Sequence, residues 1–161
     1  MNATKKTGFD VYSAAGLAAR LVVGGVFIYS GFLKSVAPPE EFAAVIEGYK
    51  ILPVSLTVTA ASFMSWTELF LGVFLVCGFL TRQCALAAAG LLAFFELLLF
   101  SVVIRKIPLA DCGCFGTGGS RSVPYAIAED AVLLILALLA FRYGHRLFAL
   151  DSWAAPCGEK K

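Results

Sequence analysis

The chain has 161 residues, of which 60% are hydrophobic and 15% are charged, and its 13 basic and 11 acidic residues leave a formal net charge of +2. A soluble domain is about 45–50% apolar and about 25% charged, so this chain has too few charged side chains to cover a soluble surface. The composition excludes a disordered chain, a secreted disulfide scaffold and a nucleic-acid-binding protein, and it indicates a protein embedded in a bilayer.

Four stretches are long enough to cross a membrane, which requires about 20 mostly apolar residues for about 30 Å of hydrocarbon. They are residues 11–36, 55–80, 84–104 and 126–150. None is free of charge, since they contain Arg20, Glu68, Glu96 and Arg142. The sequence predicts an all-α fold, in which a single domain over residues 1–161 forms an integral membrane four-helix bundle.

Basic residues indicate the orientation of these spans. Four spans put both termini and the turn 81–83 on one side of the membrane. That side would hold eight basic residues, namely Lys5, Lys6, Arg20, Arg82, Arg142, Arg146, Lys160 and Lys161. The other side would hold five, namely Lys34, Lys50, Arg105, Lys106 and Arg121. The excess favours cytoplasmic termini in a bacterial inner membrane. The first span is expected to be a retained anchor, because Arg20 interrupts the apolar core that a cleaved signal peptide needs.

The outer connection between the first two spans is expected to contain a short helix. Two prolines, Pro38 and Pro39, precede two acidic residues, which suits a helix start. Apolar residues then recur at helical spacing, from Phe42 to Tyr49. This pattern predicts a helix that lies along the membrane interface.

The second outer connection, residues 105–125, carries the polar, glycine-rich run Asp111-Cys112-Gly113-Cys114-Phe115-Gly116. A disulfide between Cys112 and Cys114 would close a very small ring, and strained, exposed disulfides are the labile or catalytic ones. The pair is therefore predicted to carry thiol–disulfide chemistry. A static disulfide that holds the loop and a soft-metal site are the alternatives, although two thiolates are too few for a closed tetrahedral site.

The other cysteines have less distinctive surroundings. Cys77 and Cys84 lie in or beside apolar spans and are expected to pack as small residues. Cys157, in the polar tail, is expected to be an ordinary thiol, with a lipid anchor as an alternative.

Acidic residues inside the spans are costly in hydrocarbon and are often paired, protonated or functional. Counting residues from the span ends puts Arg20 and Glu68 at a similar depth, so a salt bridge between them is one expectation and a functional role for Glu68 is the other. Glu96, Glu129 and Asp130 lie toward the cysteine loop and together would offer a proton path, although Glu129 and Asp130 also fit an interfacial position.

Three further expectations concern packing. Lys34 is expected to extend to the outer interface. Gly24, Gly25 and Gly31, with Ser30, suggest close helix packing along the first span. Trp66, beside Glu68, either shapes a pocket for a flat quinone ring or faces lipid.

These motifs resemble a known family. The order of five motifs resembles that of the MauE branch of the DoxX-like membrane proteins. The motifs are the run from Arg20 to Gly24, the segment Phe27-Ile28-Tyr29-Ser30-Gly31-Phe32-Leu33-Lys34, the residues from Phe42 to Pro53, Trp66-Thr67-Glu68-Leu69 and the Cys-Gly-Cys-Phe-Gly run. The resemblance implies a four-span inner-membrane protein for redox maturation of exported proteins. It implies that Cys112 and Cys114 exchange disulfides with a periplasmic thioredoxin-like partner or an exported disulfide-rich protein, as in methylamine utilisation.

The resemblance has a limit that affects the cofactor. Four-helix disulfide enzymes that pass electrons to quinone carry a Cys-x-x-Cys pair and a second outer pair, and this chain has neither. A lipid quinone stays an open choice of cofactor, because no motif in the sequence indicates a quinone-binding site. The favoured function is a thiol–disulfide oxidoreductase or its redox partner, with Glu68, Glu96 and Asp130 in support. A non-enzymatic assembly factor and a soft-metal binding or transport protein are the alternatives.

Overall fold

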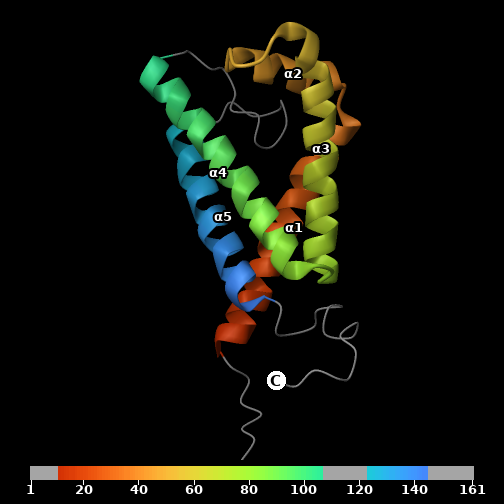
Figure 1. The fold of residues 1–161 in the computed structure, drawn as a ribbon, viewed down its shortest axis with the longest axis vertical. Coiled ribbons are helices and arrows are strands. Elements are labelled where there is room, and N and C mark those ends of the chain that lie inside the picture. The colour runs from red at the N-terminus through yellow and green to blue at the C-terminus, as the bar shows by residue number, and fades with distance from the viewer. Residues whose placement is uncertain (1–10, 107–122, 145–161) are drawn as a thin grey trace, which may run out of the picture.

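The computed structural model describes residues 11–106 and 123–144, and this part of the chain is helical throughout apart from short turns (Figure 1). The helices are α1 (Val11–Val36), α2 (Pro39–Gly48), α3 (Val54–Cys77), α4 (Thr81–Arg105) and α5 (Val123–Tyr143). All except α2 are long and apolar enough to cross a membrane. The predicted all-α fold with four candidate spans is confirmed, with shifts of a few residues at the span ends.

The shorter elements follow from local sequence. Pro39 opens α2 and Glu40 and Glu41 occupy its first turn, as the helix-start pattern predicts. Between α3 and α4 the chain reverses over residues 78–80, where Gly78 adopts a left-handed φ of 72° and its N–H donates to the Leu75 carbonyl oxygen at 3.2 Å. Glycine takes this conformation without steric cost, which lets α3 end abruptly.

The helix bundle has two ends, which we call the terminal end and the α2 end (Figure 1). At the terminal end lie the start of α1, the α3–α4 turn and the end of α5. At the α2 end lie α2, the end of α4 and the start of α5. Helix α1 packs mainly against α3 and α5, and α4 packs against α5, whereas the consecutive helices α3 and α4 contact each other much less.

Two glycines allow the close contact between α1 and α3. A Cβ atom built on Gly31 would lie 2.6 Å from the backbone nitrogen of Leu69, and one built on Gly72 would lie 2.7 Å from that of Ile28. No side chain fits at such distances, so the two backbones touch. The expectation for Gly25 is wrong, because nothing lies within 4 Å of its Cβ position and the residue faces outward.

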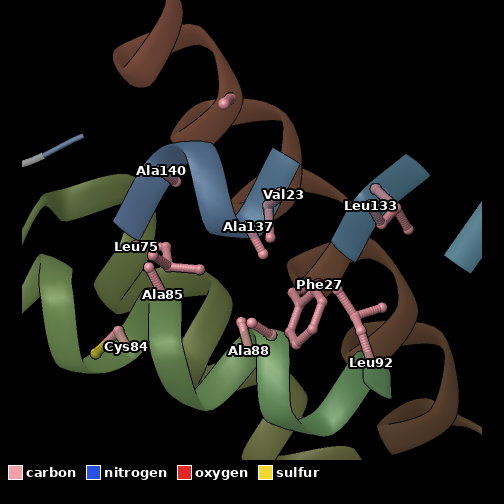
Figure 2. Close-up of a cluster of buried hydrophobic side chains, with 12 residues drawn as sticks. Val23, Phe27, Leu75, Cys84, Ala85, Ala88, Leu92, Leu133, Ala137 and Ala140 are labelled. Atoms are coloured by element: carbon pink, nitrogen blue, oxygen red, sulfur yellow. The ribbon is translucent and has the colours of Figure 1, made fainter. Parts of the chain in front are cut away.

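The main apolar core lies where α1, α4 and α5 meet α3 (Figure 2). Val23 and Phe27 of α1 pack there against small residues, which include Ala88 of α4 and Ala137 of α5. Small side chains let helices approach closely, so this part of the bundle is tightly packed. Cys84 is buried in this core, as a packing residue would be, whereas Cys77 is exposed.

Helix α2 and the residue after it pack on α3, α4 and α5 at one end of the bundle. Its Phe42 and Ala43 pack on Ala61 of α3. Tyr49, directly after α2, packs on Leu99 and Val102 of α4 and on Ala126 of α5. The helix thereby lies across the end of the bundle, which agrees with the short helix predicted there (Figure 1).

Candidate functional site

A buried ion pair links α1 to α3 toward the α2 end. Lys34 Nζ donates to Glu68 Oε1 at 2.8 Å and to Oε2 at 2.9 Å, and Ser30 Oγ donates to Oε2 at 2.9 Å. The side chains of Lys34 and Glu68 are only 1% and 6% exposed. Lys34 therefore does not extend to the interface, and that expectation is wrong.

The predicted Arg20–Glu68 salt bridge is also wrong, because the helix ends do not align. A Cβ built on Gly24 would lie 2.8 Å from Val76, one residue before α3 ends. Arg20 lies a further turn toward the terminal end, far from the level of Glu68. Its Nη1 donates instead to the Gly144 carbonyl oxygen at 3.1 Å, directly after α5. A cation suits a helix C-terminus, where carbonyl oxygens lack helical partners.

Aromatic rings surround the buried ammonium group. Lys34 Nζ lies 4.6 Å from the centroid of the Phe42 ring and 5.5 Å from that of Phe95. These rings attract the cation through their negative faces and keep water away from it. The ion pair is thus enclosed by α1, α2, α3 and α4 together.

Two buried carboxyl groups from different helices meet at one small cavity. The cavity has a volume of about 30 Å³ and is lined by Ser30, Glu68 and Asp130, together with apolar side chains of α1, α4 and α5. Asp130 is buried in α5, in the second turn after the helix start at Val123. The lining is mostly apolar, but three polar side chains reach the cavity, and its volume exceeds the about 10–15 Å³ that a water molecule needs. Carboxyl groups, a hydroxyl group and room for water are the components that hold and pass protons inside membranes.

Of the predicted proton path through Glu96, Glu129 and Asp130, only Asp130 lines this cavity, and Glu96 and Glu129 are half-buried elsewhere. The carboxyl group that shares the cavity with Asp130 is that of Glu68. The roles of Glu68, Glu96 and Asp130 in the chemistry stay predictions.

One signal for the Lys34–Glu68 pair is present in the sequence. Lys34 follows Gly31 by three residues, and Glu68 precedes Gly72 by four, so each charged side chain shares a helix face with a glycine. Joining the two glycine faces brings the charges together, whereas counting depth from the span ends separates them.

A larger cavity lies between α3 and α4 beneath α2. Its volume is about 270 Å³, and Phe42 and Phe95, which also contact the Lys34 ammonium group, form part of its wall. This cavity was not predicted from the sequence, because its walls come from three helices. Trp66 lines neither cavity and is 52% exposed, which agrees with its lipid-facing interpretation.

Cys112, Cys114 and Cys157 lie outside the described residues. The described elements that flank the cysteine loop are α4 and α5, and the end of α4 and the start of α5 both lie at the α2 end (Figure 1). Thiol–disulfide chemistry at Cys112 and Cys114 therefore stays a prediction.

Comparison with known proteins identifies the family. The family model described as "Methylamine utilisation protein MauE" matches residues 12–143. A relative from Paracoccus denitrificans, "Methylamine utilization protein MauE", is 31% identical over 122 residues. The match covers 75% of this chain and 65% of the relative, less than two thirds of that protein's length. No solved structure matches the chain. With four apolar helices of membrane-spanning length and a family match that contains all the described helices almost completely, this multi-pass membrane protein belongs to the MauE family.

Proposed function

We propose that this protein acts in methylamine utilisation as a membrane thiol–disulfide protein, with Cys112 and Cys114 as the exchanging pair. The observation that carries the proposal is the combination of MauE family membership with a Cys-Gly-Cys pair in the connection between α4 and α5. The partner is a periplasmic thioredoxin-like protein or an exported protein rich in disulfides, since disulfides form and persist outside the cytoplasm.

The arrangement of the helices supports this location. Both flanks of the cysteine connection lie at the α2 end, opposite the ends of α1 and α5 (Figure 1). The excess of basic residues at the terminal end favours a cytoplasmic position for that end in a bacterial inner membrane. The cysteine connection then faces the oxidising periplasm.

The chemistry proceeds in two exchanges. The Cys114 thiolate attacks a partner disulfide, so that a mixed disulfide forms and one partner thiolate leaves. The Cys112 thiolate then attacks Cys114 Sγ, so that the partner leaves as a dithiol and the Cys112–Cys114 disulfide remains. Two electrons pass from this pair to the partner, and the reverse sequence oxidises the partner. Cys114 is the proposed attacking residue because it is nearer than Cys112 in the sequence to the start of α5, and a helix start favours a thiolate.

Protons move with these electrons, and the buried carboxyl groups support this part of the reaction. Glu68 and Asp130 both line one small cavity in the bundle, whose other walls are mostly apolar. We assign them, with Glu96, the role of supporting residues that exchange protons while thiols become thiolates and disulfides.

The test uses a variant in which Cys77, Cys84 and Cys157 are replaced by serine, so that only the pair remains. Intact cells are treated with a membrane-impermeant maleimide before and after mild reduction. We expect labelling only after reduction, and we expect Cys112→Ser to trap a partner in a mixed disulfide through Cys114. The matched control is Cys84→Ser in the otherwise unsubstituted chain, which removes a buried thiol but leaves the Cys112–Cys114 pair intact and is therefore expected to trap no partner.

The alternatives give different results. An assembly factor would retain its partner when both cysteines are replaced, with no change in the partner's thiol state. A soft-metal protein would show cysteine-dependent metal binding and no mixed disulfide. Normal partner maturation in the Cys112→Ser/Cys114→Ser variant contradicts the proposed exchange.

A further inference from the structure

The large cavity at the α2 end is apolar almost throughout. It measures about 270 Å³, and Thr67 and Tyr49 are the only lining residues that carry a hydroxyl group. The Thr67 Oγ1 group donates to the Phe63 carbonyl oxygen of its own helix at 2.7 Å. A ligand inside this cavity therefore contacts aliphatic side chains and aromatic rings. The part of the ligand that the cavity encloses is accordingly expected to be hydrocarbon.

The cavity opens sideways toward the bilayer. Phe63 of α3 and Phe94 of α4 border it and are 76% and 49% exposed, respectively. Both lie well inside spans of membrane length. Access from the lipid phase between α3 and α4 is therefore direct, and the sparse contact between these two helices leaves room for it.

Three basic residues lie close to Tyr49, a lining residue at the α2 end of the cavity, although none of the three lines the cavity itself. Lys50 is exposed and follows Tyr49 directly. Arg105, at the end of α4, places its Nη1 3.1 Å from the Tyr49 carbonyl oxygen. Lys106 follows and is also exposed. One acidic residue, Glu47, stands against these three cations at this end of α2, and it accepts a hydrogen bond from Thr57 at 3.0 Å. The other two acids of the helix, Glu40 and Glu41, lie in its first turn.

We propose that this cavity binds one acyl chain of an anionic phospholipid, with the lipid phosphate held by Lys50 and Arg105. The combination of an apolar cavity that opens into the bilayer and two cations at its surface end matches the two parts of such a lipid. A zwitterionic phospholipid fills the same cavity and carries the same phosphate, but its ammonium group offsets that charge and is repelled by the two cations, so it gains less from them. A prenyl chain with an uncharged ring leaves them without a counter-ion.

A bound lipid would also affect the buried Lys34–Glu68 ion pair. Phe42 and Phe95 line the cavity and lie against Lys34 Nζ at 4.6 Å and 5.5 Å to their ring centroids. An acyl chain against these rings would hold them over the ammonium group and keep water from the Lys34–Glu68 pair. This site goes beyond the proposed thiol exchange and does not depend on it.

The experiment uses delipidated full-length protein in detergent, titrated with phosphatidylglycerol or phosphatidylcholine and observed by native mass spectrometry. We expect one tightly bound phosphatidylglycerol per chain. A basic residue near a lipid surface contributes a preference of about fivefold for the anionic head group. Lys50→Asn is therefore expected to lower the preference for phosphatidylglycerol by about fivefold, and asparagine tolerates the left-handed backbone at this position, where φ is 54°. Arg82→Gln, which removes a cation at the terminal end, is the matched control.

A second pair of variants tests the cavity itself. Ala60→Trp fills the cavity and is expected to weaken phosphatidylglycerol binding at least tenfold. Ala87→Trp, on an exposed face of α4 outside the cavity, is expected to bind as the unsubstituted protein does. If Ala60→Trp does not fold, Met64→Trp fills the same cavity from a half-buried position. Unchanged binding in the folded cavity variant, equal affinity for the two phospholipids, or preferential retention of a prenyl lipid would each overturn the proposal.

Discussion

An unpaired lysine charge in the hydrocarbon of a membrane is costly in free energy, and Lys34 is paired. Its ammonium group lies between both Glu68 oxygens and two aromatic rings, and Ser30 donates to the same carboxylate. A buried pair of this kind contributes little over an apolar pair of the same volume, but the loss of one partner leaves a buried charge. The two residues therefore depend on each other.

This dependence predicts the effect of substitution. We expect Glu68→Gln to lower the free energy of unfolding in detergent by about 3–5 kcal/mol, because the Lys34 charge loses its counter-ion. Replacing both partners, Lys34→Met with Glu68→Leu, should recover most of that loss. Thermal unfolding in micelles measures both. Glu96→Gln, which removes a half-buried carboxyl outside the cluster, is the control and should cost less.

The double variant also separates packing from chemistry. If it folds and still supports thiol exchange, the pair serves only the fold. If it folds and exchange is lost, Glu68 has the supporting role proposed above. A double variant no more stable than Glu68→Gln alone would contradict the pairing argument.

At the level of helices, the contact between α1 and α3 depends on backbone proximity. We expect Gly72→Ala to destabilise the bundle by about 1–3 kcal/mol, since its new Cβ would lie 2.7 Å from the Ile28 backbone nitrogen. Gly25→Ala is the matched control on the neighbouring helix, where nothing lies within 4 Å of the Cβ position. It should leave stability unchanged or raise it by up to about 1 kcal/mol through helix propensity. Equal effects in the two variants, measured by thermal unfolding in micelles, would show that the contact is looser than described.

Hydropathy and length were enough to predict the helices but not their register. The spans are long apolar runs, and the Pro38-Pro39 pair with two following acids marked α2. The register was missed because apolar side chains cover every face of a membrane helix, so composition does not reveal which face is buried. Gly24 and Gly25 illustrate this, since they are consecutive residues of one type and only Gly24 contacts α3.

For the candidate site, the sequence likewise indicated which residues are unusual but not which residues they contact. The cost of acids in hydrocarbon identified Glu68 and Glu96 as unusual, but the cavity is lined by Glu68 and Asp130, and Glu96 does not line it. Their surroundings depend on which helices pack together, and the packing does not follow chain order. The partner of Glu68 was therefore assigned to the wrong basic residue, and the cavity beneath α2 had no counterpart in the sequence.

For the whole molecule, the arrangement of ends predicts a labelling pattern. In a cysteine-free chain, Gln83→Cys at the α3–α4 turn and Lys50→Cys after α2 lie at opposite ends. We expect an impermeant maleimide to label Lys50→Cys in intact cells and to label Gln83→Cys only after the cells are opened. The reverse pattern would place the terminal end outside and would remove the basis for a periplasmic cysteine connection.

The contact between Arg20 and Gly144 has a consequence for biogenesis. The guanidinium group and the carbonyl oxygen that accepts its hydrogen bond are 124 residues apart in the chain. Gly16 and Tyr143 also meet at this point, so the first and last spans close the bundle against each other. During synthesis α1 enters the bilayer long before its partner exists. Assembly is therefore completed only when α5 has left the ribosome, and a chain truncated before α5 would present Arg20 without this acceptor to the quality-control proteases of the membrane.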